Sequence, residues 1–158
     1  MYFSEIKLVL KKITFKKLLN AVLLYFSYFF STFFKSTIRR RFPLSISIEP
    51  TSLCNLKCPQ CPTGIGDLLR NKGNIDFTLY KKIIDEFSPN LLNIILYFQG
   101  EPFLNKNIFS LIDYASNTKR IFTVSSTNGH FLDTKNCERI IKSGLDKLII
   151  SLDGTDQE

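Results

Sequence analysis

The feature that most constrains the fold is a regular alternation of short apolar segments with amphipathic helical segments, which begins at Pro43. Four segments have the alternating or continuous apolar pattern of short strands. A helical segment lies between each strand and the next. The resulting βαβαβαβ order predicts an α/β fold with a parallel sheet and right-handed crossovers. The predicted strands cover residues 44–48, 93–98, 121–125 and 148–152.

The three helical segments carry signals for their boundaries and for their buried faces. Asp76 is a predicted N-cap for the first helix. Apolar residues at 108, 111, 112 and 115 place one side of the second helix against the sheet. Asp133 or Thr134 is predicted to cap the third helix. The apolar face predicted for that helix carries Cys137, Ile140 and Ile141.

Only six residues follow the last predicted strand, which bears on how the sheet is completed. A parallel sheet buries both of its faces, and an uncovered edge strand exposes unpaired backbone groups. We therefore expect residues 43–158 to be the N-terminal part of a larger or split fold. A C-terminal half with further βα units would be its partner.

Residues 1–42 differ from the rest and are predicted to form a Phe-rich amphipathic arm. They contain no Gly or Pro, and a helix is predicted over residues 5–35. A narrow polar stripe divides a wide apolar surface, which suits packing into the fold or onto a partner, or contact with a membrane surface. The apolar run of 17 uncharged residues is at the lower edge of the length that crosses a bilayer, and a signal peptide is disfavoured because no small-x-small cleavage site follows the run. The stripe consists of Lys16, Asn20, Ser27, Ser31 and Lys35.

The positive charge of the chain is confined to this arm. Residues 1–42 contain nine Lys or Arg and a single acidic residue, Glu5, whereas residues 43–158 contain 12 basic and 13 acidic residues. The remainder of the chain is therefore close to neutral. A nucleic-acid partner that binds a basic face of the globular part is not expected.

Three of the four cysteines, Cys54, Cys58 and Cys61, fall within eight residues in the spacing C-x3-C-x2-C. Such a cluster favours a metal site in a reducing compartment over disulfides. Three thiolates on one loop can bind three irons of a cubane cluster and leave the fourth iron without a protein ligand. A zinc site completed by Cys137 or His130 is the alternative.

Polar clusters follow the other predicted strands at the point where each strand ends. They are Gln99–Pro102, residues 126–129 with the sequence STNG, and residues 151–154 with the sequence SLDG. The carboxyl ends of the strands are where βα-barrel enzymes place their active sites. Each of these motifs alone is an ordinary turn signal. The prediction of an active site therefore rests on their common position at one edge of the sheet.

With the cysteine spacing, these motifs make the chain resemble the radical S-adenosylmethionine (SAM) superfamily. The sequence QGEP at 99–102 is similar to the GGEP motif of that family, and residues 47–51, with the sequence SIEPT, are similar to members that carry a C-terminal SPASM domain. The resemblance implies a partial (β/α)6 TIM-like barrel with about four parallel strands, preceded by the N-terminal amphipathic helix. Two positions depart from the family pattern: Gln60, where an aromatic residue is frequent, and Gln99 in place of Gly.

The resemblance also implies the cofactors and the reaction. Cys54, Cys58 and Cys61 would bind a [4Fe-4S] cluster, and reductive cleavage of SAM would yield a 5′-deoxyadenosyl radical that abstracts hydrogen from a substrate, with peptides among the candidates. A reductant such as flavodoxin or ferredoxin would supply the electron. An oxygen-sensitive cluster favours a cytoplasmic location, with membrane association through residues 1–42. The residues implied to lie around SAM are Gly100, Glu101, Asn128, Ser151 and Asp153.

Two alternatives to a radical SAM enzyme predict a chain without catalytic activity. The chain could be a zinc-stabilised, membrane-associated module without catalysis, which is motivated by the basic arm and the absent half of the sheet. It could also be an inactive gene fragment. His130, the single histidine, is interpreted as an exposed loop residue.

Overall fold

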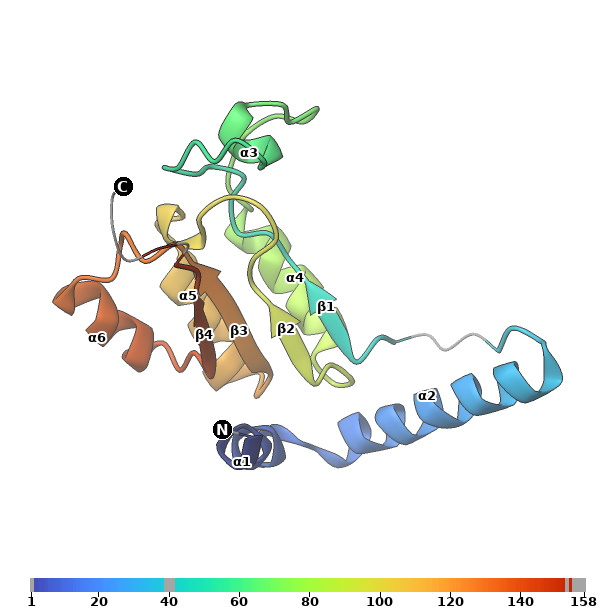
Figure 1. Cartoon of the computed structure of the whole chain (residues 1–158). Coiled ribbons are helices and arrows are strands. Elements are labelled where there is room, and N and C mark those ends of the chain that lie inside the picture. The colour runs from blue at the N-terminus through green and yellow to red at the C-terminus, as the bar shows by residue number, and fades with distance from the viewer. Residues whose placement is uncertain (1, 39–41, 153, 155–158) are drawn as a thin grey trace.

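Four parallel strands form the sheet of this protein, in the spatial order β1-β2-β3-β4 (Figure 1). The computed structural model describes residues 2–38, 42–152 and 154. Every strand pairs with its neighbour in sequence in a parallel register. The strands are β1 (Ser45–Ser47), β2 (Asn93–Ile95), β3 (Phe122–Thr127) and β4 (Lys147–Ile150).

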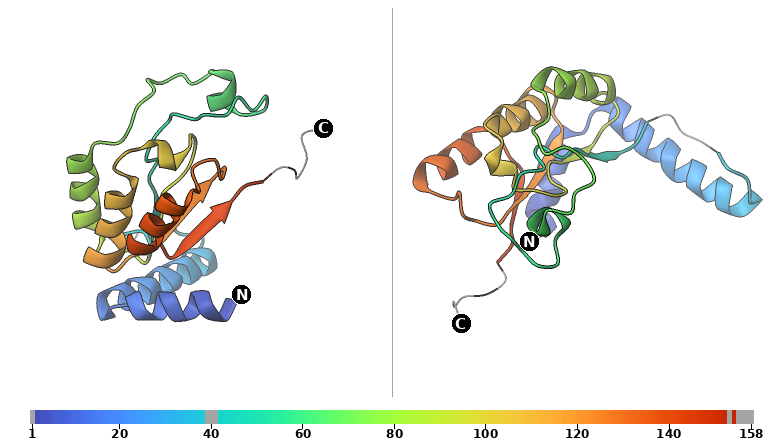
Figure 2. Two further views of the ribbon diagram at one scale, coloured as in Figure 1. Left: turned by 90° about the vertical axis from the view of Figure 1, so that its left-hand side faces the viewer. Right: turned by 90° about the horizontal axis from the view of Figure 1, so that it is seen from above.

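Helices α4 (Phe77–Phe87), α5 (Ile108–Asp113) and α6 (Thr134–Lys142) lie on one face of the sheet (Figures 1 and 2). α5 continues into a π-helical turn, η2 (Tyr114–Thr118). A sequential strand order with all crossover helices on one face is the arrangement of a βα barrel, since a doubly wound sheet reverses its order. The fold is therefore α/β, with the first four strands of a partial TIM-like barrel, as predicted.

The main apolar core lies between the sheet and these helices. Ile46, Ile94 and Thr123 are register partners that face the helices, and the last two are fully buried. The predicted buried positions 108, 111, 112 and 115 are all fully buried. The prediction for α6 is correct for Ile140, which is buried, but wrong for Ile141, which is 78% exposed. The side of α6 that packs against the sheet is therefore narrower than the apolar pattern of its sequence suggested.

The predicted caps of α4 and α6 are present. Asp76 accepts a hydrogen bond from the backbone N–H of Leu79 at 2.8 Å, and Asp133 accepts one from the backbone N–H of Asn136 at 2.6 Å. Each carboxylate therefore satisfies an otherwise unpaired donor in the first turn and fixes where its helix begins.

The N-terminal arm contains two helices, so the prediction of one helix over residues 5–35 was wrong. α1 (Tyr2–Lys12) ends before Thr14, and α2 (Phe15–Phe34) begins after it. Thr14 has extended backbone angles, and its hydroxyl accepts a hydrogen bond from the backbone N–H of Lys17 at 3.4 Å. A threonine is a good N-cap residue, and this cap starts a new helix without any Gly or Pro.

Both arm helices lie at the end of the sheet where the strands begin (Figure 2). Lys12 binds the carboxylate of Asp146, and its ammonium also donates to the Ser116 hydroxyl at 2.7 Å and to the Ile121 carbonyl at 3.1 Å. Glu5 and Val9 of α1 line a cavity against the sheet face that points away from α4–α6. The arm is thus attached to the body through buried polar contacts.

Candidate functional site

The cysteine loop lies above the carboxyl end of the sheet and ends in the short helix α3 (Pro62–Ile65) (Figure 1). Cys61 is the N-cap residue of that helix, and its backbone N–H donates to the Cys58 carbonyl at 3.1 Å. The loop closes tightly because Gly64 lies against Cys58. A Cβ atom at Gly64 would lie only 2.6 Å from the backbone N and O of Cys58.

Two of the thiols already interact with backbone N–H groups. The backbone N–H of Leu56 donates to Cys54 Sγ at 3.4 Å. A hydrogen bond from the backbone N–H of Gly64, followed by contributions from Thr63, lowers the pKa of Cys61. The lowered pKa of Cys61 favours its thiolate, which is the form that binds metal. Backbone N–H groups directed at sulfur also tune iron–sulfur clusters.

The donor set of this loop fits a cubane cluster. Within the described residues, no three His, Cys, Asp or Glu side chains converge as ligands of a single metal ion would. A [4Fe-4S] cluster instead distributes its thiolates over separate irons, and all three cysteines are partly accessible on one loop. Cys54, Cys58 and Cys61 are the residues that would hold it.

Gly100 permits the close contact between the loop that follows β2 and the segment that leads into the cysteine loop. Its φ is +77°, and a Cβ atom there would lie 2.4 Å from the Thr51 carbonyl oxygen and 2.8 Å from that of Leu53. Only glycine adopts this conformation at this distance without strain. The backbone N–H of Glu101 then donates to the Leu53 carbonyl at 2.7 Å, which fixes the two segments together.

Glu101 is 2% exposed, and its carboxylate is held by donors from the last residue of β3 and from the residue that follows it. One oxygen accepts from the Thr127 hydroxyl at 2.8 Å, and the other accepts from the backbone N–H of Asn128 at 2.9 Å. A buried carboxylate is costly unless it is hydrogen-bonded in this way. The sequence did not indicate Thr127 as a site residue, although its place in the STNG segment at the end of a strand was a signal for it.

The side chains of Asn128 and Ser151 also reach this edge of the sheet. Asn128 Nδ2 donates to Asn55 Oδ1 in the cysteine loop at 2.9 Å, and the Ser151 hydroxyl lies 3.4 Å from that of Ser126. Nothing in the sequence singled out Asn55, which lies between two cysteines. The loops that follow β1, β2, β3 and β4 are therefore joined at one place.

One cavity of about 220 Å³ collects most of the predicted site residues. Asp153 lies outside the described residues. His130 is exposed, as predicted, and its ring Nδ1 lies 3.2 Å from Asn128 Oδ1. Cys61 does not line the cavity but follows Cys58 at the start of α3. The lining includes Cys54, Cys58, Gly100, Glu101, Asn128 and Ser151.

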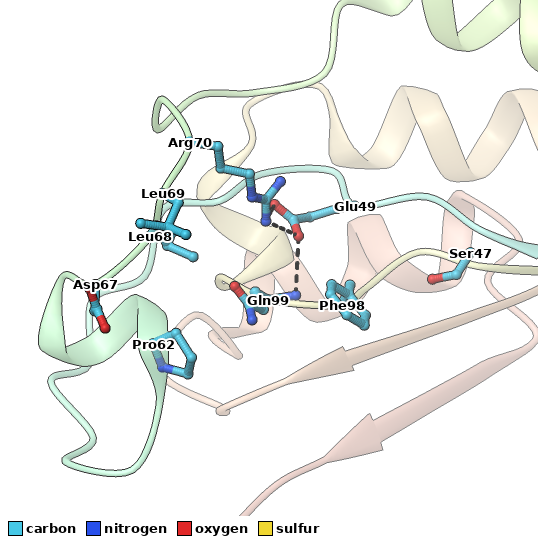
Figure 3. Close-up of a pocket in the computed structure, with 9 residues that line it drawn as sticks. All are labelled: Ser47, Glu49, Pro62, Asp67, Leu68, Leu69, Arg70, Phe98 and Gln99. Atoms are coloured by element: carbon cyan, nitrogen blue, oxygen red, sulfur yellow. Dashed lines mark hydrogen bonds and ion pairs between the residues drawn. The ribbon is translucent and has the colours of Figure 1, made fainter.

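A second cavity of about 700 Å³ lies on the β1 side of the first (Figure 3). Both oxygens of Glu49 accept hydrogen bonds from Arg70, at 2.7 and 2.6 Å. One of these oxygens lies 3.4 Å from the backbone nitrogen of Gln99, which donates to it. Phe98, 73% exposed, lines both cavities.

Comparison with known proteins decides the family. The model of the Radical SAM superfamily matches residues 48–158, which is more than half of the chain. This chain belongs to the radical SAM superfamily. The family implies a [4Fe-4S] cluster and SAM as cofactors, and the three cysteines of the predicted cluster loop are present.

Relatives of this radical SAM protein have diverse activities. An AdoMet-dependent heme synthase from Nitratidesulfovibrio vulgaris is 32% identical over 112 residues, 70% of this chain and 30% of the relative. An S-adenosyl-L-methionine-dependent 2-deoxy-scyllo-inosamine dehydrogenase from Niallia circulans is 29% identical over 109 residues, 67% of this chain and 43% of the relative. The crystal structure of BtrN in complex with AdoMet and 2-DOIA superposes with a TM-score of 0.64 and 27% identity, and covers 77% of this chain and 50% of BtrN. The chain thus spans half or less of the length of these proteins.

Proposed function

We propose that this chain is the cofactor-binding part of a radical SAM enzyme of the SPASM type, which acts on a C–H bond of its substrate as an oxidoreductase or transferase. The observation that supports this most directly is the shared cavity, in which Cys54 and Cys58 face Gly100 and Glu101. When bound, the cluster and SAM supply reductive cleavage of a carbon–sulfur bond and hydrogen abstraction. A flavodoxin-like or ferredoxin-like protein is the proposed electron donor, and the cytoplasm is the proposed location.

The residues of this chain have distinct roles in the proposal. Cys54, Cys58 and Cys61 hold the cluster through thiolates. Glu101 presents a fixed negative charge to the ammonium group of SAM, because its donors at and directly after the end of β3 prevent the carboxylate from turning away. Gly100 lets the backbone approach the amino-acid portion of SAM. Phe98 lines both this cavity and the larger one, which we propose admits the substrate.

Metal analysis of protein purified and reconstituted without oxygen tests the cluster. The wild-type chain and Cys137→Ala should each hold about four irons per chain, whereas Cys54→Ala, Cys58→Ala and Cys61→Ala should each lose the cluster. Cys137 is the matched control because it is a partly buried cysteine on α6, away from the cluster loop. Native zinc in place of iron would instead favour the non-catalytic module.

Replacement of Glu101 by Gln tests SAM binding separately. A glutamine can still accept from the Asn128 N–H and donate to the Thr127 hydroxyl, and it loses only the long 3.3 Å bond from the Phe103 N–H, so the fold and the cluster should persist while the charge is lost. The affinity for SAM, measured by the change it causes in the EPR spectrum of the reduced cluster, should fall about 10- to 100-fold. Glu49→Gln, at the neighbouring cavity, should leave that affinity unchanged. Equal affinity in Glu101→Gln and wild type would exclude the proposed role of this carboxylate.

A further inference from the structure

Helix α2 is attached to the protein by its polar side, which is the reverse of an ordinary core helix. Lys17 and Asn20 are its buried residues, with 2% and 6% exposure. The Lys17 ammonium donates to the Arg120 carbonyl at 2.5 Å, and Asn20 Nδ2 lies 3.3 Å from the carbonyl oxygens of Phe42 and Asn90. These contacts fix the rotation of the helix about its own axis.

The opposite side of α2 is apolar and faces away from the body. We call this surface the arm face. Its side chains are between 41% and 72% exposed, and they fall within an arc of about 100° on the helix. Beyond its first turns α2 also extends past the edge strand β1 (Figure 1). The arm face consists of Leu18, Leu19, Val22, Phe26, Phe29 and Phe33.

Contacts along the helix keep the aromatic side chains ordered. The rings of Phe26 and Phe30 stack with centroids 6.4 Å apart, and Phe30 stacks in turn on Phe34 at 6.0 Å. A contiguous exposed apolar surface of this kind marks an interaction site in a folded protein. Prior ordering of the rings lowers the entropy cost of inserting them into an apolar phase.

The charges around the arm face indicate the chemistry of its partner. Four exposed lysines lie on α1, on α2 or directly after α2, and the sequence adds three arginines at 39–41. The one acidic residue of the arm, Glu5, is paired with Lys147 of β4 at 3.0 Å. Apolar aromatic groups bordered by basic groups complement the acyl chains and anionic headgroups of a lipid surface. The exposed lysines are Lys7, Lys11, Lys16 and Lys35.

We propose that the arm face inserts into an anionic membrane, with α2 in the plane of the interface and the body of the enzyme above it. By length and composition, α2 is the one helix of the described chain that could cross a bilayer, with a mean hydropathy of 1.3. A crossing helix would have to withdraw Lys17 and Asn20 from their buried contacts, whereas an in-plane helix keeps them. This proposal is independent of the reaction proposed above.

Vesicle co-sedimentation of the whole chain tests the partner. Binding to vesicles with about 50% phosphatidylglycerol should exceed binding to pure phosphatidylcholine and should weaken with salt. Phe29→Asp should reduce the partition coefficient at least about tenfold. The matched control is Ile141→Asp, an exposed apolar residue on α6, which should bind as the wild type does. Equal loss in both variants, or a wild-type dimer that binds no vesicles, would overturn the proposal.

A tryptophan introduced on the same side of α2 as the arm face tests the orientation, because the chain has none of its own. Phe15, Phe26 and Phe33 lie on the same side of α2 at its beginning, middle and end. Each is replaced by Trp in turn, and its depth is measured by quenching with brominated lipids. Three equally shallow positions are expected for an in-plane helix. A depth that changes along the helix, with Phe26→Trp deepest, would show a spanning helix and refute the in-plane arrangement.

Discussion

Gly100 shows how one residue sets the geometry of the cofactor cavity. The loop after β2 passes so close to the backbone of Thr51 and Leu53 that no side chain fits, and Glu101 is positioned by the same contact. The carboxylate is buried and lies where its donors Thr127, at the end of β3, Asn128 and Phe103 require it. Glycine is thus required at position 100 for steric reasons, in addition to any contact that its backbone makes with a cofactor.

We expect Gly100→Ala to destabilise the chain by about 2–4 kcal/mol, because the new Cβ atom would overlap backbone atoms and the positive φ would be strained. Gly73→Ala is the matched control, since a Cβ atom there would meet nothing within 4 Å. The measurement is the free energy of unfolding in urea. If the two variants lost the same amount, close backbone contact would not be the reason for glycine at 100.

Among the elements, the strands and the helices on the sheet were predictable, whereas the arm was not. Strands have a period-two or continuous apolar pattern that is read directly, and Asp76 and Asp133 carry local cap signals. The break at Thr14 has no Gly or Pro, and threonine is common inside helices as well as at caps. The predicted polar stripe of α2 included Asn20, which is buried, but it omitted the buried Lys17 and included Lys16, which is exposed. The pattern could not show which polar residues face the body, because that depends on the carbonyls of Arg120 and Asn90, far away in sequence.

The site was predictable to a similar extent and for a related reason. The cysteine spacing and the motifs at the strand ends are local, so they pointed to Cys54, Glu101 and Asn128 without any tertiary information. The partners Asn55 and Thr127 become recognisable only when loops from different strands meet. Sequence patterns therefore pointed to the residues proposed to hold the cluster and SAM, and they missed Asn55 and Thr127, which orient two of those residues.

The docking of α2 is expected to depend on pH through Lys17. Burial, and then the charges of Arg120 and Lys12, lower its pKa from 10.5 to about 8. Below pH 8 Lys17 is protonated in both the folded and the unfolded state, so the free energy of unfolding is lowered by the full cost of burying its charge. Between pH 8 and 10.5 the unfolded state holds the extra proton, and the free energy of unfolding rises with pH.

This dependence gives a prediction for wild type and Lys17→Met. From about pH 7.5 to 9.5, the unfolding free energy of the wild type should rise by about 1–2 kcal/mol relative to that of the variant, which lacks the titrating group. The measurements stay below pH 10 to avoid a contribution from Tyr80. Burial raises the pKa of Tyr80 in the folded protein. Its ionisation on unfolding would lower the unfolding free energy, which is the opposite of the effect of Lys17. Urea titrations across this range provide the measurement. Parallel curves for the two proteins would mean that Lys17 keeps an ordinary pKa.

At the scale of the whole molecule, the two proposed functions occupy opposite ends of the parallel sheet. The cysteine loop and its cavity lie where the strands end, and α1 and α2 lie where the strands begin (Figures 1 and 2). A barrel enzyme keeps stability and chemistry apart in this way, because loops at one rim can vary without disturbing the other. A membrane at the arm would therefore leave the cofactor cavity open to solvent and to a soluble electron donor.

The separation predicts that the two functions can be lost one at a time, since variants at sites without shared contacts have additive effects. Phe29→Asp should release the chain from anionic vesicles and still assemble about four irons and respond to SAM. Cys58→Ala should lose the cluster and bind vesicles with wild-type affinity. Iron analysis and vesicle co-sedimentation on both single variants and on the double variant check this. Weakened vesicle binding in Cys58→Ala would mean that cluster assembly and arm docking are coupled through the sheet, and the arm would then be part of the cofactor-dependent fold.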